Sequence, residues 1–160
     1  MGLFFKNTVC VFISAILFIA SWAENGFPFL LFIAFVPLLL IQTERISKIQ
    51  YAAYVFLTFV ILGFASFLWL CKISWTASLV LIWQPILMTI PFLLYQYMRK
   101  NDRAMLANFA FIAFWLSLEL LFLTWDYAVP WVLMGNAFGD WVKVIQWYEY
   151  TGILGEMVCI

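Results

Sequence analysis

Long hydrophobic runs separated by short polar stretches make up most of this chain. The runs occupy residues 3–22, 27–41, 51–71, 76–98 and 104–125. An α-helix rises about 1.5 Å per residue, so a run of about twenty residues spans a hydrocarbon core of roughly 30 Å. The run at 27–41 would reach only about 22 Å, so we expect it to form a tilted, thin or partly re-entrant hairpin with the first run. The pattern predicts an all-α, polytopic transmembrane helix bundle of about five spans.

The composition is typical of a membrane protein rather than a soluble one. Hydrophobic residues make up 68% of the chain, charged residues 10%, and the mean hydropathy is +1.06. A globule of 160 residues has too much exterior to hide that much apolar surface from water. Eight basic and eight acidic residues leave no net charge, so nucleic acid is not an expected partner.

No cofactor and no metal site is expected. The chain has no histidine, which is the commonest metal ligand and the commonest acid–base group near neutral pH. Its three cysteines, Cys10, Cys71 and Cys159, lie far apart and form no CxxC pair. They lie in or beside apolar runs, where low-dielectric surroundings disfavour the thiolate that a nucleophile needs. We interpret them as small apolar side chains.

The basic residues predict which side of the membrane each loop faces. With the amino terminus inside, the inner side receives Lys6, Arg45, Lys48, Arg99, Lys100 and Arg103, and the outer side receives Lys72 and Lys143. Inner loops of membrane proteins carry such an excess of Lys and Arg. The fifth span is therefore expected to end on the outer face of the membrane.

Two features of the spans allow a second interpretation. The run from Lys6 to Ala20 could be a secretory signal, although further spans follow it directly and a retained first span suffices. Pro85 and Pro91 should bend the fourth span, and the bend could either line a cavity or only adjust the packing.

Glu119 lies inside the fifth span, about two turns from its outer end. An ionised acid at mid-depth costs roughly 2.5–3.5 kcal/mol on insertion scales, and less near the interface. The residue could be a polar anchor that faces the bundle interior, where it could hold the following loop or contact a lipid headgroup. It could equally be a protonated or water-accessible residue near the interface. The sequence leaves both interpretations open.

The chain after the fifth span is polar, aromatic and rich in turn signals. Gly135-Asn136 and Gly139-Asp140 predict turns, and residues 126–150 are expected to form an exterior loop and helix at the membrane interface. Residues 151–160 begin a sixth apolar run that stops after a few residues. We therefore expect a truncated fragment of a longer protein, with a membrane bundle at 1–125 before these two segments.

The order of residues from Glu119 onward resembles that of one known family. The matching residues are Glu119, Pro130-Trp131, Gly135-Asn136, the stretch from Ile145 to Gly152, and Gly155, with Phe27-Pro28 and Pro37-Leu38 earlier in the chain. In this order they resemble the membrane part of bacterial apolipoprotein N-acyltransferase.

The resemblance implies a multi-helix inner-membrane domain followed by a periplasmic nitrilase-like domain. The family moves an acyl chain from a phospholipid to the amino-terminal cysteine of a diacylated lipoprotein, using a Glu–Lys–Cys triad in the nitrilase-like domain. No segment here resembles that domain, so we expect this chain to hold no catalytic residue and to be inactive alone. The lipoprotein substrate would bind through the missing nitrilase-like domain, and the membrane lipid partner would be the phospholipid acyl donor.

The resemblance also implies a location and a set of substrate-adjacent residues. The protein would be a multi-pass component of the bacterial inner membrane, with its amino terminus in the cytoplasm and residues 126–150 in the periplasm. The residues next to lipid or substrate would be Glu119, Pro130, Trp131, Gly135, Asn136, Gly152 and Gly155.

Two other classes of function stay open. A small multi-span transporter subunit would need polar residues through several spans, and these spans offer little beyond Gln84 and Glu119. A structural membrane scaffold needs no such path, and nothing in the sequence excludes it.

Overall fold

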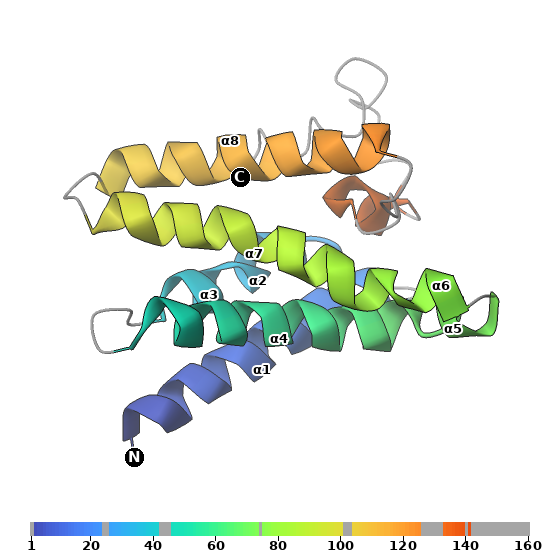
Figure 1. The fold of residues 1–160 in the computed structure, drawn as a ribbon, viewed down its shortest axis with the longest axis horizontal. Helices are drawn as coiled ribbons and strands as arrows, with labels where there is room; N and C mark the ends of the chain where they lie inside the picture. The colour runs from blue at the N-terminus through green and yellow to red at the C-terminus, as the bar shows by residue number, and fades with distance from the viewer. Residues whose placement is uncertain are drawn as a thin grey trace.

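The computed structural model describes residues 2–23, 26–41, 46–73, 75–100, 104–125, 133–139 and 141 (Figure 1). Within these ranges every element is a helix. The long helices are α1 (Gly2–Trp22), α4 (Lys48–Phe67), α7 (Val80–Arg99) and α8 (Ala104–Thr124). The short ones are α2 (Leu30–Ala34), α3 (Val36–Leu39), α5 (Leu70–Ile73), α6 (Trp75–Ser78) and the 3-10 helix η3 (Met134–Phe138).

The predicted fold class is confirmed, because the described chain is all-helical and α1, α4, α7 and α8 are each long and apolar enough to cross a membrane. α4 packs against both α1 and α7, and α7 packs against α8. Figure 1 shows α4, α7 and α8 stacked side by side, with α1 crossing below α4 at a steeper angle. Large apolar side chains on the outside of all four helices remain exposed, as expected for surfaces that lie in lipid. The division into residues 1–125, 126–150 and 151–160 stays a prediction.

Helix α4 begins at Lys48, before the apolar run that starts at residue 51, because a capping box stabilises its first turn. The Ser47 hydroxyl accepts a hydrogen bond from the Gln50 backbone N–H at 3.2 Å, and the Gln50 side chain accepts one from the Ser47 N–H at 3.0 Å. Hydropathy does not register such a cap. The capping box thereby places two polar residues, Lys48 and Gln50, on the helix.

The short segment between α1 and α4 is a broken helix. α2 ends at Ala34 and α3 begins at Val36, with Phe35 at the break. Pro37 lies in the first turn of α3, where its missing backbone N–H costs nothing, and its ring disfavours the carbonyl position that a helix continuing from α2 would need. Breaks of this kind leave backbone groups unpaired, and inside a membrane these must find partners in the protein.

Three neighbouring helices donate side-chain hydrogen bonds to carbonyls of the broken segment. The donors are Ser14 of α1 to the Ala34 carbonyl, Tyr51 of α4 to the Leu38 carbonyl at 3.4 Å, and Arg99 of α7 to the Leu39 carbonyl at 3.3 Å. Each donor comes from a different helix, so the broken segment is tied to most of the bundle.

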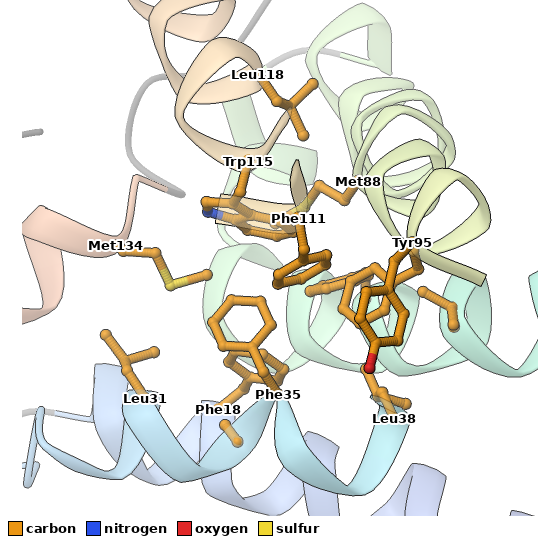
Figure 2. Packing of buried hydrophobic residues seen from close by; sticks show 14 of the residues in the cluster. Phe18, Leu31, Phe35, Leu38, Met88, Tyr95, Phe111, Trp115, Leu118 and Met134 are labelled. Carbon is orange, nitrogen blue, oxygen red and sulfur yellow. The ribbon is translucent and has the colours of Figure 1, made fainter. Parts of the chain in front are cut away.

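Aromatic rings fill the centre of the bundle (Figure 2). Trp115 of α8 is 1% exposed, and its ring centroid lies 4.9 Å from that of Phe35, 5.9 Å from Phe59 of α4 and 6.1 Å from Phe92 of α7. Phe18 of α1 packs edge-on against Phe35 at 5.1 Å. Since each long helix and the broken segment contributes a ring, one cluster holds all of them together.

The surroundings of the α7 prolines favour the interpretation that they adjust helix packing over the interpretation that they line a cavity. Pro85 and Pro91 are both buried inside the helix. Pro85 borders a cavity of about 20 Å³, which has room for little more than one water molecule. Gly63 of α4 faces this region, and a methyl group added there would meet Leu81 at 3.7 Å, an ordinary contact. Helices α4 and α7 therefore do not pack tightly at Gly63.

Candidate functional site

The segment that contains η3 packs against the end of the bundle where α8 finishes (Figure 1). Leu133, Met134 and Phe138 are buried and belong to the same cluster as the residues of the long helices. Residues 133–139 are therefore part of the folded core. This segment and the side chains that hold it form the candidate site.

Glu119 is the polar centre of this site. It is 2% exposed, and its Oε1 atom accepts a hydrogen bond from the indole Nε1 of Trp115 at 2.9 Å and another from the backbone N–H of Met134 at 3.1 Å. A buried carboxylate is costly unless such donors satisfy it. The second bond joins α8 to the first residue of η3 across fifteen positions of sequence.

The local structure of α8 explains why Glu119 points inward. Residues four apart on an α-helix lie on the same face, so Glu119 shares the face of Trp115. Trp115 is held in the aromatic cluster, and Figure 2 shows its indole nitrogen directed toward the side from which Met134 approaches. The core packing of Trp115 thus fixes where the carboxylate lies.

Aromatic contacts hold the other end of the segment. The ring of Phe138 meets Phe29 edge-on at 5.5 Å and Phe32 at 6.2 Å. Trp141 packs edge-on against Phe27 at 5.7 Å and Phe29 at 5.8 Å. The segment is therefore fixed at two points, by a carboxylate of α8 and by rings at the start of the broken helix.

The structure brings three of the predicted site residues into one region. Gly135 and Asn136 directly follow Met134 in η3; Gly135 is buried and Asn136 is exposed. The Asn136 carbonyl accepts a hydrogen bond from the Gly139 N–H at 3.2 Å, which closes the end of η3. Pro130, Trp131, Gly152 and Gly155 lie outside the described residues, so their roles stay predictions.

Of the two interpretations of Glu119, the geometry matches the inward-facing anchor. The side chain is buried and hydrogen-bonded to the segment that follows the span, as a loop-holding anchor requires. Contact with a lipid headgroup, the other part of that interpretation, stays a prediction.

The partners of Glu119 were not predicted from the sequence. Trp115 gave a usable signal, because an indole donor one turn before a carboxylate in an apolar span can satisfy it. Met134 gave none, since its backbone N–H is the donor and every residue except proline has one. Phe29 and Phe138 could not be paired either, because phenylalanines occur throughout the chain.

Polar side chains elsewhere in the spans mostly bond to carbonyls of their own helix. Thr58 donates to Tyr54 at 3.1 Å and Thr89 to Pro85 at 2.8 Å. Among the described residues no three metal-binding side chains come together. Cys10 is half-buried in α1 and Cys71 is exposed in α5. The described groups that contact Glu119 are two hydrogen-bond donors, the Trp115 indole and the Met134 backbone N–H.

Comparison with known proteins places the chain in a family. Residues 14–159 match the family model described as the apolipoprotein N-acyltransferase N-terminal domain. No curated protein and no solved structure matches the chain. The family match covers nearly all of the sequence, including every residue of the site around Glu119.

Proposed function

The chain belongs to the apolipoprotein N-acyltransferase N-terminal domain family, and from that premise we propose that it forms the membrane part of a lipoprotein N-acyltransferase. In this proposal an acyl chain passes from a membrane phospholipid to the amino-terminal cysteine of a lipoprotein. The membrane part positions lipid and presents an exterior segment, while a nitrilase-like domain outside residues 1–160 makes and breaks the bonds.

The observation that carries the proposal is the hydrogen bond that the Met134 backbone N–H donates to the Glu119 carboxylate. It fixes the segment that follows α8 at the end of the bundle, where substrates would approach. A pre-positioned segment contributes to catalysis because orientation reduces the entropy lost on reaching the transition state. Glu119 is thus proposed as a positioning residue and not as an acid or base in the reaction.

We further propose that the bundle lies in a bacterial inner membrane with its amino terminus in the cytoplasm. The six inner basic residues against two outer ones support this orientation. Cysteines introduced singly at Gly139 and at Gln42 should report it. A membrane-impermeant thiol reagent should label the Gly139 variant from the periplasm and the Gln42 variant only after the membrane is opened. The reverse pattern would invert the proposed topology.

Substitution of Glu119 in the native gene tests the positioning role. Glu119→Ala removes both acceptor bonds and should lower the rate of lipoprotein N-acylation by about 10- to 100-fold, since a misplacement of about 1 Å can cost about 100-fold. Glu119→Gln keeps a carbonyl acceptor for both donors and should lower the rate less than threefold. The readout is the ratio of triacylated to diacylated amino-terminal peptides of a lipoprotein, by mass spectrometry.

The matched control is Ser117→Ala. Ser117 is exposed on the same helix and bonds only to the carbonyl of its own turn, at Ala113. It should leave acylation unchanged. If Glu119→Ala acylated lipoproteins at the normal rate while the protein stayed in the membrane, the positioning role would be wrong.

Trp131 provides a second test of the same segment. By resemblance it borders the opening through which acyl chains enter, although an interfacial anchor is the alternative for a tryptophan near a membrane boundary. Trp131→Ala should reduce acyl transfer without reducing membrane insertion. Unchanged turnover would assign Trp131 to anchoring alone.

A further inference from the structure

A groove opens at the end of the bundle opposite Glu119, between the start of α4 and the end of α7. Its volume is about 490 Å³, within the range of sites that enclose small-molecule ligands. Its lining includes Lys48, Ala52, Leu93, Leu94, Tyr97 and Lys100. We call this feature the basic groove.

The two lysines of the basic groove are available to a ligand. Both side chains are exposed, and among the described residues neither ammonium group has an ion-pair partner. Lys48 Nζ lies 5.9 Å from the ring centroid of Tyr97, which also lines the groove. Arg99 differs, because its guanidinium donates to the Leu39 carbonyl and to the Tyr95 hydroxyl at 3.5 Å. Arg99 therefore bonds within the fold, whereas Lys48 and Lys100 line the groove.

The other lining residues are mainly apolar, and they lie deeper along the helices. Lys48 is the first residue of α4 and Lys100 follows the last residue of α7, whereas Ala52 and Leu93 lie one to two turns further in. Because α4 and α7 are long enough to cross a membrane, their ends lie at headgroup depth and their inner turns at acyl-chain depth. The lysines of the groove therefore lie at the depth of lipid headgroups, and its apolar residues lie at the depth of acyl chains.

We propose that the basic groove binds an anionic phospholipid. Lys48 and Lys100 would contact the phosphate, and an acyl chain would lie along Leu93 and Leu94. Charge complementarity selects this occupant, because the connections 42–48 and 99–103 carry five basic residues against two acidic ones, Glu44 and Asp102. Basic clusters at the ends of spans attract anionic headgroups over neutral ones.

This site is separate from the proposed acyl-transfer function. α8 runs the length of the bundle, and Glu119 lies near its last turn. The basic groove lies at the other end of the bundle (Figure 1). Substitutions in the groove should reduce lipid binding without changing the effect of Glu119 substitutions on acylation. The failure of one proposal can therefore be told from the failure of the other.

The experiment measures lipid retention on the whole chain in detergent by native mass spectrometry. The lipids are phosphatidylglycerol and phosphatidylcholine with identical acyl chains, supplied in equal amounts. The wild-type protein should retain phosphatidylglycerol preferentially. The double variant Lys48→Gln, Lys100→Gln should retain it roughly 10- to 30-fold less, as expected for two basic side chains removed from a headgroup.

The control is the double variant Lys6→Gln, Lys72→Gln, which removes the same number of charges from exposed positions that do not line the groove. It should retain phosphatidylglycerol as the wild type does. Equal retention of the two lipids by the wild type, or an equal loss in this control, would overturn the proposal.

Ala52→Phe tests whether the lipid enters the groove itself. Ala52 is half-buried in the lining, so a phenyl ring there fills apolar space while both lysines remain. Retention of phosphatidylglycerol should fall at least threefold. Full retention in this variant, with helix content unchanged by circular dichroism, would place the lipid on the charges alone and overturn the groove. If Ala52→Phe failed to fold, the exposed lysine variants would still decide the proposal.

Discussion

The two ends of the bundle differ in structure: one is closed by packed side chains and the other is open. At one end a buried carboxylate and a set of aromatic rings close the structure over residues 133–139. At the other end the helices separate around the basic groove, and two lysines are left without ion-pair partners among the described residues. A closed end can hold a backbone segment in one place, whereas an open end can exchange a ligand. Under the two proposals made above, positioning and lipid binding belong to separate parts of one small bundle.

Removing the central indole should have the largest effect on this contrast. Trp115→Ala leaves a cavity among four rings and deprives Glu119 of a donor, so the free energy of unfolding should fall by about 3–5 kcal/mol. Tyr97→Ala at the open end removes a ring that is 61% exposed and should cost less than about 1 kcal/mol. Unfolding by SDS in mixed micelles, followed by circular dichroism, measures both. Similar losses for the two variants would mean that the ends are equally packed.

Gly26 should be the next most sensitive position, because it turns the chain from α1 into the broken helix at the closed end. A Cβ atom there would lie 2.5 Å from the Ala20 carbonyl oxygen and 2.7 Å from that of Ala23, both backbone atoms. Gly26→Ala should therefore lower the free energy of unfolding by about 2–3 kcal/mol. The control Gly63→Ala has room for its methyl group and should be neutral or stabilising by up to about 1 kcal/mol. A neutral Gly26→Ala would refute the tight turn.

Loss of the carboxylate should loosen only the closed end. Glu119→Leu removes the acceptor of the Met134 N–H, and hydrogen exchange at that amide should accelerate by about 10- to 100-fold. Exchange at the Tyr51 amide, which donates to the Ser47 carbonyl in the first turn of α4, should not change. Equal acceleration at both amides would show that the substitution destabilises the whole bundle rather than releasing one segment.

The smallest effect is expected at the broken helix. Tyr51→Phe keeps the ring but removes the donor to the Leu38 carbonyl, and should cost about 0.5–1.5 kcal/mol. Tyr54→Phe on the same helix is the control. Among the described residues the Tyr54 hydroxyl has no recorded hydrogen bond, so its loss should be close to neutral. Unfolding in SDS distinguishes the two variants, and equal costs would remove the role assigned to Tyr51.

Hydropathy alone was enough to predict an all-helical membrane bundle, because lipid leaves a chain no other way to satisfy its backbone without closing a barrel. The same reasoning singled out Glu119, since a charge inside an apolar span must find partners. What it could not supply was the identity of those partners. The Met134 N–H is a backbone group, and its approach to Glu119 depends on how residues 133–139 fold back.

The start of α4 and the break near Phe35 show a second limit of the sequence. The capping box at Ser47 extends α4 into polar residues that a hydropathy window assigns to a loop. Pro37 signals the break, but the sequence does not reveal that Ser14, Tyr51 and Arg99 donate hydrogen bonds to carbonyls of the broken segment. Contacts between residues up to sixty positions apart depend on the packed bundle and not on any local pattern.

The broken helix also constrains the order in which the protein can be assembled. Ten residues from Leu30 to Leu39 rise about 15 Å, half the thickness of a hydrocarbon core, so lipid alone would not retain them as a span. Their carbonyls acquire Tyr51 and Arg99 as partners only after α4 and α7 have been synthesised and inserted. The early part of the chain must therefore wait in an incomplete state for its later helices. Residue 99 marks the earliest point in synthesis at which the first hairpin can reach its final form.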